Sequence, residues 1–147
     1  DIVNPDVVQP LYNVYDIEYE TSGLKDHVTK NNLGVCFFSP IKHGILTGKY
    51  NSIPNFPKGD FRRSVKEFKD VEFIKKMKEN RNRIESKFPN LGEDAIMQSL
   101  LAAILFGNPT ACVLLGQRNK TQAEIAGRLG RPITKKDSLW ILSLYRN

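Results

Sequence analysis

Three short apolar runs, each followed by a loop-like segment and separated from the next by helix-like sequence, constrain most strongly what this chain can fold into. The runs cover residues 7–12, 35–38 and 113–115. The second, Val35–Phe38, is apolar at every position and lies between Gly34 and Pro40, which is typical of a strand buried on both faces of a parallel sheet. Strands that alternate with helices favour a parallel sheet whose ligands bind beyond the carboxyl ends of the strands. The sequence therefore predicts an α/β fold with about three parallel strands and flanking helices.

The segments between and after these runs carry helical signals. Helices are predicted over residues 21–30, 70–88, 95–106 and 119–130, with a last helix from 134 to 145. The segment 95–106 is apolar nearly all round, which is typical of a deeply buried helix. Asn119 and Thr134 stand where helix N-caps are expected, because each is followed three residues later by a side chain that can complete the cap. The glycine- and proline-rich segment 40–59 is predicted to be a loop.

Length and composition limit the architecture and the cellular setting. The 147 residues, 40% hydrophobic and 26% charged, are expected to form one soluble domain spanning 1–147. A closed eight-stranded barrel takes about 250 residues, so the chain is expected to be either a small open α/β domain or part of a barrel. No apolar run reaches the roughly 20 residues that cross a bilayer, and the amino terminus lacks both a basic, apolar leader and an initiator Met. We expect a cytoplasmic protein with no membrane span, and a processed chain or a fragment.

The net charge of +6 raises the question of a nucleic-acid partner. Residues 58–87 hold 11 basic and 6 acidic side chains, so almost all of the excess lies in this one stretch. Charges of opposite sign are interleaved along it, which favours a solvated helix face over a phosphate-binding surface. The phenylalanines nearby are interpreted as packing residues rather than base-stacking platforms. No nucleic-acid partner is therefore expected.

Two cysteines, Cys36 and Cys112, belong to the second and third strand-like segments. Because such segments are usually buried, both are predicted to be buried, reduced thiols rather than a disulfide or a metal-binding pair. No metal site is predicted.

Basic side chains follow the second and third runs, at the edge where ligands are expected. Arg118 precedes the proposed helix start at Asn119, where free backbone N–H groups favour an anion such as phosphate. Lys49 and the arginine pair at 62–63 follow the second run, on what would be the neighbouring rim. Phe38 ends that run, where an exposed ring could stack on a planar ligand. The residues alone leave ordinary alternatives open: Arg118 as a solvated loop residue, Phe38 in the core and Lys49 on the surface.

Three motifs extend this hypothesis. Gln9–Asn13, Ser39–Tyr50 and Gly116–Gln122 read Gln-Pro-Leu-Tyr-Asn, Ser-Pro-Ile-Lys-His-Gly-Ile-Leu-Thr-Gly-Lys-Tyr and Gly-Gln-Arg-Asn-Lys-Thr-Gln. In order and spacing they resemble the aldo-keto reductase family, specifically the branch of potassium-channel β-subunit-like reductases. The resemblance implies a (β/α)8 TIM barrel, of which this chain supplies the C-terminal part with the sixth to eighth strands.

The resemblance also implies an NADP(H) site and a role for each matching residue. Gln9 would hydrogen-bond the nicotinamide carboxamide, and Phe38 would stack on the nicotinamide ring. The loop after Phe38 would line the pyrophosphate. The arginine pair at 62–63, with Arg118 and Gln122, would hold the adenosine end and favour NADP(H). The residues expected to contact the cofactor are Gln9, Phe38, Ser39, Pro40, Ile41, Gly44, Thr47, Lys49, Arg62, Gly116, Arg118 and Gln122.

The chemistry implied by the resemblance is carbonyl reduction by hydride transfer, with a tyrosine proton donor tuned by Lys and by His or Asp, all from the first half of the barrel. No tyrosine or histidine of this chain stands in such a context, so no catalytic residue is predicted. The isolated chain is expected to bind cofactor but to be inactive. The alternative is a non-catalytic half-barrel that acts as a nucleotide-binding, interaction or channel-regulatory module. Because a three-stranded sheet leaves two open edges, the chain is expected to self-associate or to recruit a complementary N-terminal half-barrel.

Overall fold

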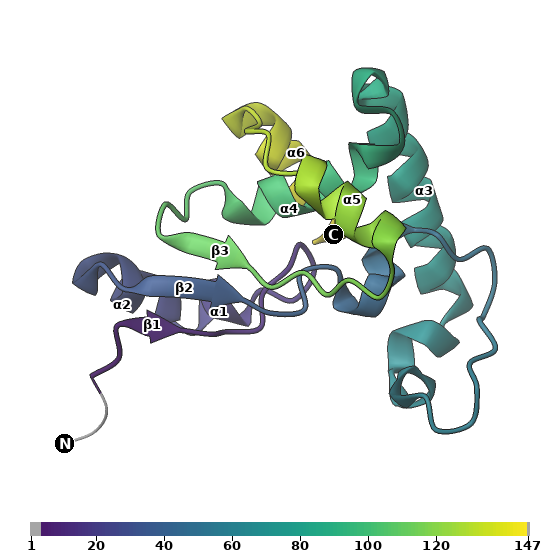
Figure 1. Ribbon diagram of the computed structural model, residues 1–147, viewed down its shortest axis with the longest axis horizontal. Coiled ribbons are helices and arrows are strands. Elements are labelled where there is room, and N and C mark those ends of the chain that lie inside the picture. Colours follow the sequence, from purple (N-terminus) through teal and green to yellow (C-terminus); the bar gives the residue numbers. More distant parts are fainter. Residues whose placement is uncertain (1–3, 147) are drawn as a thin grey trace.

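The computed structural model describes residues 4–146 and contains a parallel sheet of three strands (Figure 1). The strands are β1 (Val7–Val8), β2 (Gly34–Phe37) and β3 (Ala111–Val113), in the order β1-β2-β3. In register, Val8 pairs with Val35 and Cys36 pairs with Cys112. The predicted α/β fold with three parallel strands is therefore confirmed.

The strand limits differ from those predicted. β1 ends at Val8, and only an isolated bridge joins Leu11 to Phe38 beyond it. Pro10 interrupts the ladder between them because it has no N–H to donate. β3 begins at Ala111, two residues before the predicted run, and ends at Val113.

The helices alternate with the strands. The α-helices are α1 (Glu18–Thr21), α2 (Leu24–Asn31), α3 (Val71–Lys87), α4 (Ala95–Leu105), α5 (Lys120–Arg128) and α6 (Lys135–Tyr145). The 3-10 helices are η1 (Lys42–Thr47), η2 (Phe61–Ser64), η3 (Lys66–Lys69) and η4 (Pro89–Asp94). The helix predicted over 21–30 is instead divided, because Gly23 adopts a φ of 83° between α1 and α2. The segment predicted as a loop contains η1.

Side-chain caps begin two of the helices as the sequence predicted. The Asn119 side chain accepts a hydrogen bond from the Gln122 backbone N–H at 2.9 Å. Thr134 Oγ1 accepts from the Asp137 N–H at 3.1 Å and starts α6. Each cap satisfies an N–H group that has no partner within its own helix.

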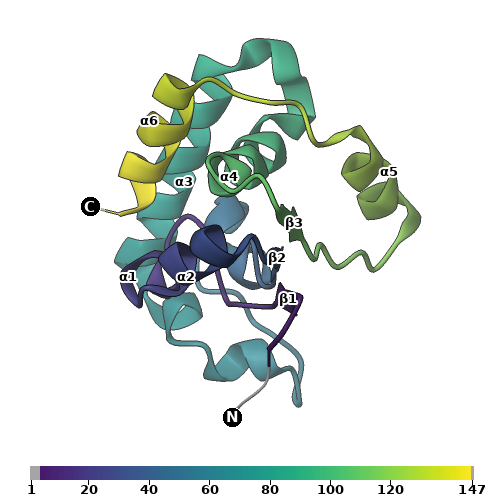
Figure 2. The same ribbon diagram turned by 90° about the vertical axis from the view of Figure 1, so that its left-hand side faces the viewer.

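One face of the sheet carries the hydrophobic core. Helices α1, α2, α3, α4 and α6 gather on one side of the sheet, whereas α5 stands apart from them (Figure 2). Val35 and Phe37 are buried, and the Phe37 ring packs against Tyr12 and Tyr19 with centroids 4.7 and 5.0 Å away. Most of α4 is buried, as its sequence predicted, and no residue of α5 is. Among the described helices, none is both long and apolar enough to cross a membrane.

The opposite face is open, and this overturns part of the prediction. Cys36 is half-buried and Cys112 is exposed, rather than both being buried. Both thiols are free. Alternate residues of a strand point to opposite faces, so the apolar run around Cys36 is packed on the side of Val35 and Phe37 only. The continuous apolar pattern correctly predicted a strand, but not two covered faces.

Candidate functional site

Three loops leave the carboxyl ends of the strands along one edge of the sheet. Gln9 follows β1 and is exposed, and Phe38 follows β2 and is 40% exposed. The loops remain joined beyond the strands, because the Phe38 N–H donates to the Pro10 carbonyl at 3.1 Å and the Leu114 N–H donates to the Phe37 carbonyl at 2.9 Å. The structure thus brings the starts of all three predicted motifs to one edge, and it places Phe38 outside the core.

The loop from Ser39 to Tyr50 has an unusual backbone. Ser39, Lys42 and His43 have φ values of 56°, 44° and 58°, in the left-handed region that non-glycine residues seldom adopt. Gly44 and Gly48 add two more positive values. Such conformations persist only when surrounding contacts hold them, and they are concentrated at ligand-binding sites.

Asn13 is one of the contacts that hold this loop. It is fully buried, and its Nδ2 donates to the Ser39 carbonyl at 3.1 Å and to Asp16 Oδ2 at 2.7 Å. Its Oδ1 accepts the backbone N–H groups of Tyr15 and Asp16. Asn13 ends the first motif but was not predicted to have a role of its own. Asn side chains often bond the backbone two residues on, and this turn-forming tendency is the sequence signal that could have identified it.

Lys42 is the second contact. Its ammonium bonds both oxygens of Asp16, at 2.7 and 2.9 Å, and lies 3.4 Å from Glu67 Oε1. Burial opposes the charge of Lys42, but the hydrogen bond and charge of Asp16, reinforced by Glu67, raise its pKa above the ordinary value. The loop after β2 is therefore tied through Lys42 to both the loop after β1 and η3.

Inside the loop, several predicted cofactor residues shape the backbone. Pro40, Gly44 and Thr47 are buried, and Thr47 Oγ1 donates to the Gly44 carbonyl at 2.7 Å. Lys49 is exposed, and its side chain lies over Gly44. A Cβ built on Gly44 would stand 3.3 Å from the Lys49 Nζ. Ile41 is half-buried. Gly44 thus gives the Lys49 side chain room to lie against the loop.

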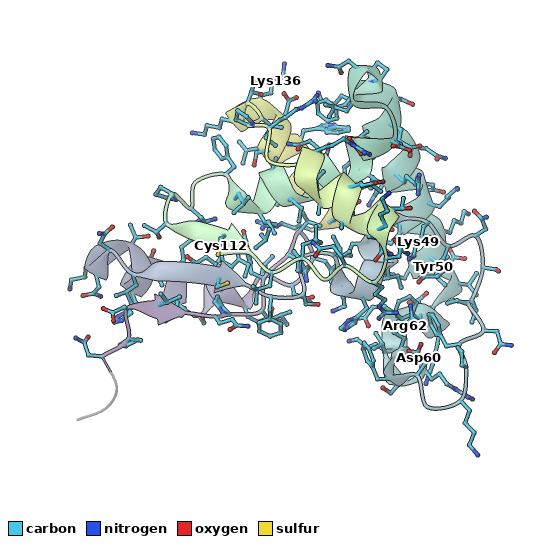
Figure 3. The ribbon with its side chains drawn as sticks, in the orientation of Figure 1. Lys49, Tyr50, Asp60, Arg62, Cys112 and Lys136 are labelled. Carbon is cyan, nitrogen blue, oxygen red and sulfur yellow. The ribbon has the colours of Figure 1, made fainter. Side chains whose placement is uncertain are left out.

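Arg62 is already held by an acidic partner. Its Nε and Nη2 donate to Asp60 at 3.0 and 2.6 Å (Figure 3). Its guanidinium also stacks on the Phe56 ring, 4.2 Å from the ring centroid. The hydrogen bonds from Arg62, followed by weaker effects that include the charge of Arg118, lower the pKa of Asp60 to about 2. A ligand phosphate at Arg62 would have to share the guanidinium with this carboxylate.

The third loop leads into the amino terminus of α5. Gly116, Arg118 and Gln122 are all exposed. Gln122 Oε1 accepts the Arg118 N–H at 2.7 Å, so its side chain closes the helix entrance. Among the described residues, no hydrogen bond or ion pair joins Arg118 or Gln122 to Lys49 or Arg62. No direct bond therefore joins these cations of the two loops.

The tyrosines with shifted pKa values are poor proton donors. Burial, together with the hydrogen bond from its OH to Glu20 Oε1 at 2.6 Å, raises the pKa of Tyr12 well above the ordinary value. Burial likewise raises the pKa values of Tyr19 and Tyr145. Burial, and then the charge of Lys42, lowers the pKa of His43.

A separate groove of about 750 Å³ lies between α4, β3 and α5. Its lining is largely apolar and includes Leu101, Leu105, Val113, Leu129 and Ile133. None of the predicted cofactor residues lines it. The groove adjoins the site at the strand ends, however, because Leu114, Leu115 and Gln117 of the loop after β3 also line it.

Comparison with known proteins identifies the family to which these features belong. A model described as the aldo/keto reductase family matches residues 1–143. The chain belongs to the aldo/keto reductase family. This confirms the family-level resemblance of the three motifs, whereas the potassium-channel β-subunit-like branch stays a prediction.

Several family members share parts of this sequence. An aldo-keto reductase of Schizosaccharomyces pombe, named yakc and described with NADP(+), is 33% identical over 72 residues, which are 48% of this chain and 21% of that protein. The L-glyceraldehyde 3-phosphate reductase of Escherichia coli K12 is 45% identical over 47 residues, or 31% of this chain and 14% of the relative. A putative pyridoxal reductase of Saccharomyces cerevisiae is 38% identical over 55 residues, or 37% and 16%.

The fold is shared with a solved aldo/keto reductase family structure. The glycerol dehydrogenase of Gluconobacter oxydans superposes with a TM-score of 0.76 at 23% identity, over 94% of this chain and 41% of that one. At this identity the likeness shows the fold alone. The chain thus spans less than half of that structure, and its matches span about a fifth or less of the curated relatives.

Proposed function

We propose that this chain is the NADP(H)-binding C-terminal part of an aldo-keto reductase (β/α)8 barrel, folded as one domain over 1–147. The observation that carries the proposal is the exposed ring of Phe38, which stands at a strand end between Gln9 and the loop that begins at Leu114. A flat aromatic surface beside an amide side chain suits a nicotinamide ring and its carboxamide. When bound, the cofactor supplies the hydride for carbonyl reduction.

Two loops carry positively charged groups that could bind the phosphates of such a cofactor. Lys49 presents its ammonium beside Gly44 in the loop after β2, and that loop is held in place by Asn13 and Lys42. Arg118 precedes α5, whose first N–H groups carry the positive end of the helix dipole. This combination of exposed cations and helix amides supports pyrophosphate binding by the loop after β2 and the start of α5.

The arginine pair at 62–63 supports a preference for NADP(H). The extra 2′-phosphate of NADP(H) needs an additional cation, and an arginine is well suited to it. The Arg62 guanidinium already forms an ion pair with Asp60, whereas the neighbouring Arg63 is exposed. In the proposed site either guanidinium contacts the 2′-phosphate.

Titration with NADPH tests the binding proposal. We expect the purified chain to quench or shift NADPH fluorescence saturably and to bind NADH more weakly. Arg118→Ala should weaken NADPH binding by about 10- to 100-fold, because it removes a charge-assisted contact to phosphate. Lys136→Ala, an exposed cation on α6 at the far end of the molecule (Figure 3), is the matched control and should leave binding unchanged. Equal weakening by the two variants, or no binding by the folded chain, would refute the site.

We expect the isolated chain not to reduce carbonyls. In the complete barrel, the other part would supply the proton donor and the residues that tune its pKa. The second candidate is a non-catalytic half-barrel that binds a nucleotide or regulates a channel. The same cofactor-binding surface at the strand ends would serve this function. NADPH oxidation by the chain mixed with a complementary N-terminal half would favour the first candidate over the second. In either case we propose a cytoplasmic location.

Assembly follows from the open face and edges of the sheet. β1 and β3 each have one edge without a strand neighbour in the described part, and the groove beside β3 is apolar. Such surfaces tend to pair with further strands. We expect the chain alone to form dimers or larger species at micromolar concentration, measured by light scattering, and a complementary half to return it to a defined complex. A well-folded chain that stays monomeric under these conditions would contradict this.

A further inference from the structure

One carboxylate stands among the cations proposed to hold the adenosine end of the cofactor. Asp60 caps η2, because its Oδ1 accepts the Arg62 backbone N–H at 3.0 Å. The same carboxylate binds the Arg62 side chain, whose Nε donates to Oδ1 at 3.0 Å and whose Nη2 donates to Oδ2 at 2.6 Å (Figure 3). The side chains of Arg62 and Asp60 are only 15% and 18% exposed. Asp60 is therefore held in place by both the backbone and the side chain of Arg62.

Asp60 also lies near the loop after β3. The hydrogen bonds from Arg62 are the main cause of the low pKa of Asp60, and the charge of Arg118 adds to them. Because water and salt screen distant charges, such an effect requires the two side chains to be close in space. Arg118 itself is exposed and lies just before α5. The carboxylate thus acts on one cation from each of the two loops proposed to bind the cofactor.

The ion pair with Asp60 occupies one edge of the Arg62 guanidinium. A guanidinium carries five N–H donors in a planar fork, and Asp60 takes the Nε donor and one of those on Nη2. The plane of the group stacks on the Phe56 ring. The hydrogen bond with Asp60 is the main cause that raises the pKa of Arg62, and Tyr50 adds to it. A phosphate at Arg62 would bind the remaining donors, with the carboxylate of Asp60 beside it.

We propose that Asp60 sets the cofactor preference of this site, accepting a hydrogen bond from the ribose 2′-OH of NAD(H) and repelling the 2′-phosphate of NADP(H). A carboxylate is a common partner of the ribose 2′-OH, whereas an arginine accommodates a 2′-phosphate. A phosphate monoester carries a charge of about −1.5 to −2 at neutral pH, so it would share Arg62 and Arg118 with a like charge. The site therefore holds recognition groups for both cofactors, and Asp60 keeps its preference for NADP(H) small.

This inference rests on the proposed function, because it requires a nicotinamide cofactor whose adenosine ribose lies at Arg62 and Arg118. Asp60→Asn removes the negative charge and keeps the size of the side chain. Asn is as good an N-cap as Asp, so the variant retains the start of η2. Without the carboxylate, both guanidinium groups are left to the 2′-phosphate.

Fluorescence titrations with NADPH and with NADH measure the preference in the unmodified chain and in Asp60→Asn. We expect the ratio of the NADH to the NADPH dissociation constant to rise about tenfold in the variant, because neighbouring like charges strongly weaken binding. Most of the rise should come from tighter binding of NADPH. An unchanged ratio would overturn the proposal. Weaker NADPH binding by the folded variant would also overturn it and would show that Asp60 serves to orient Arg62.

Two further variants control for net charge and for folding. Asp70 caps α3 through the Phe73 N–H at 2.9 Å, so Asp70→Asn changes a capping aspartate and the net charge in the same way. It should leave the ratio unchanged, and an equal rise in this control would assign the effect to the net charge of the chain. Asp60→Ser keeps a capping residue without a carboxylate and should behave as Asp60→Asn does. It provides the test if Asp60→Asn does not fold.

Competition with fragments of the cofactor locates the effect. Adenosine 2′,5′-bisphosphate and adenosine 5′-monophosphate differ only in the 2′-phosphate, so the preference for the bisphosphate should also rise in Asp60→Asn. A rise confined to the complete cofactors would overturn the assignment to the adenosine end. If the folded, unmodified chain bound neither NADPH nor NADH, the proposed function would fail and this inference with it. If both bound, with the same preference in every variant, only this inference would fail.

Discussion

Replacing Gly48 with alanine is expected to destabilise the folded chain by about 3–5 kcal/mol. Gly48 has a φ of 63°, which an L side chain rarely adopts. A Cβ at this position would stand 2.8 Å from the Arg81 Cβ and would overlap the Met77 backbone carbonyl. Because Met77 lies within α3, the carbonyl cannot move aside without distorting the helix. Backbone strain and steric overlap therefore add at one residue.

Thermal and urea unfolding of matched variants measure this effect. For a chain of this size we expect the Tm of Gly48→Ala to fall by about 10 °C or more. Gly59→Ala is the control, since Gly59 also has a positive φ, of 90°, but nothing lies within 4 Å of its would-be Cβ. That variant should lose only about 1 kcal/mol, from the backbone conformation alone. Equal losses in the two variants would mean that the contact with α3 does not limit position 48.

The contact at Gly48 also bears on the proposed site. It pins the end of the loop after β2 to α3, while Asn13 pins its start at Ser39. Between these two points lie Gly44 and Lys49, the segment proposed to face the pyrophosphate. The loop is thus placed by tertiary contacts at both ends.

The sequence predicted the helices and strands better than it predicted which of their faces are covered. The periodic apolar positions between 70 and 88 and the apolar segment after residue 95 correspond closely to α3 and α4. Local signals were sufficient there, because one face of α3 and most of α4 pack into the core. The pattern around Cys36 could not reveal an open face, because an apolar strand has the same sequence whether or not another layer covers it.

For the candidate site, the sequence predicted where the loops lie but not which residues pair within them. Motifs at the strand ends correctly located the loops, because parallel strands place their carboxyl ends at one edge. The sequence did not predict that Asp60 would hold Arg62, or that Asp16 and Glu67 would surround Lys42. Asp16 and Glu67 lie 26 and 25 positions away from Lys42, so only the tertiary fold brings them together. Asp60 is two residues before Arg62 and caps the 3-10 helix η2, which is a local signal that the sequence interpretation did not use.

Replacing Lys42 with methionine is expected to destabilise the chain by about 3 kcal/mol, because it leaves two carboxylates in a largely buried site without their cation. The side chains of Lys42, Asp16 and Glu67 are only 15%, 12% and 7% exposed. Methionine keeps the length and apolar stem of lysine, so the loss isolates the charge. Lys49→Met, an exposed lysine of the same loop, should change the free energy of unfolding by no more than about 0.5 kcal/mol. Adding Glu67→Gln to Lys42→Met should recover part of the loss, and a double-mutant cycle without coupling would refute the ion-pair explanation.

The pH dependence of unfolding separates this charge effect from packing. The folded-state pKa of Lys42 is raised, so its stabilising contribution is fully present below the unfolded value of about 10.4 and is lost as pH rises through the folded value. The pKa values of Tyr12 and Tyr145 are also raised, so these residues also lower the free energy of unfolding at alkaline pH. Both tyrosines are present in the unmodified chain and in the variant, so their effect cancels in the difference. The difference in unfolding free energy between the unmodified chain and Lys42→Met should therefore be constant from neutral pH to about 10 and should shrink above it. A difference that persists unchanged at higher pH would assign the loss to side-chain packing, and the loop after β2 would then be held by Asn13 and Gly48 without a contribution from the ion pair.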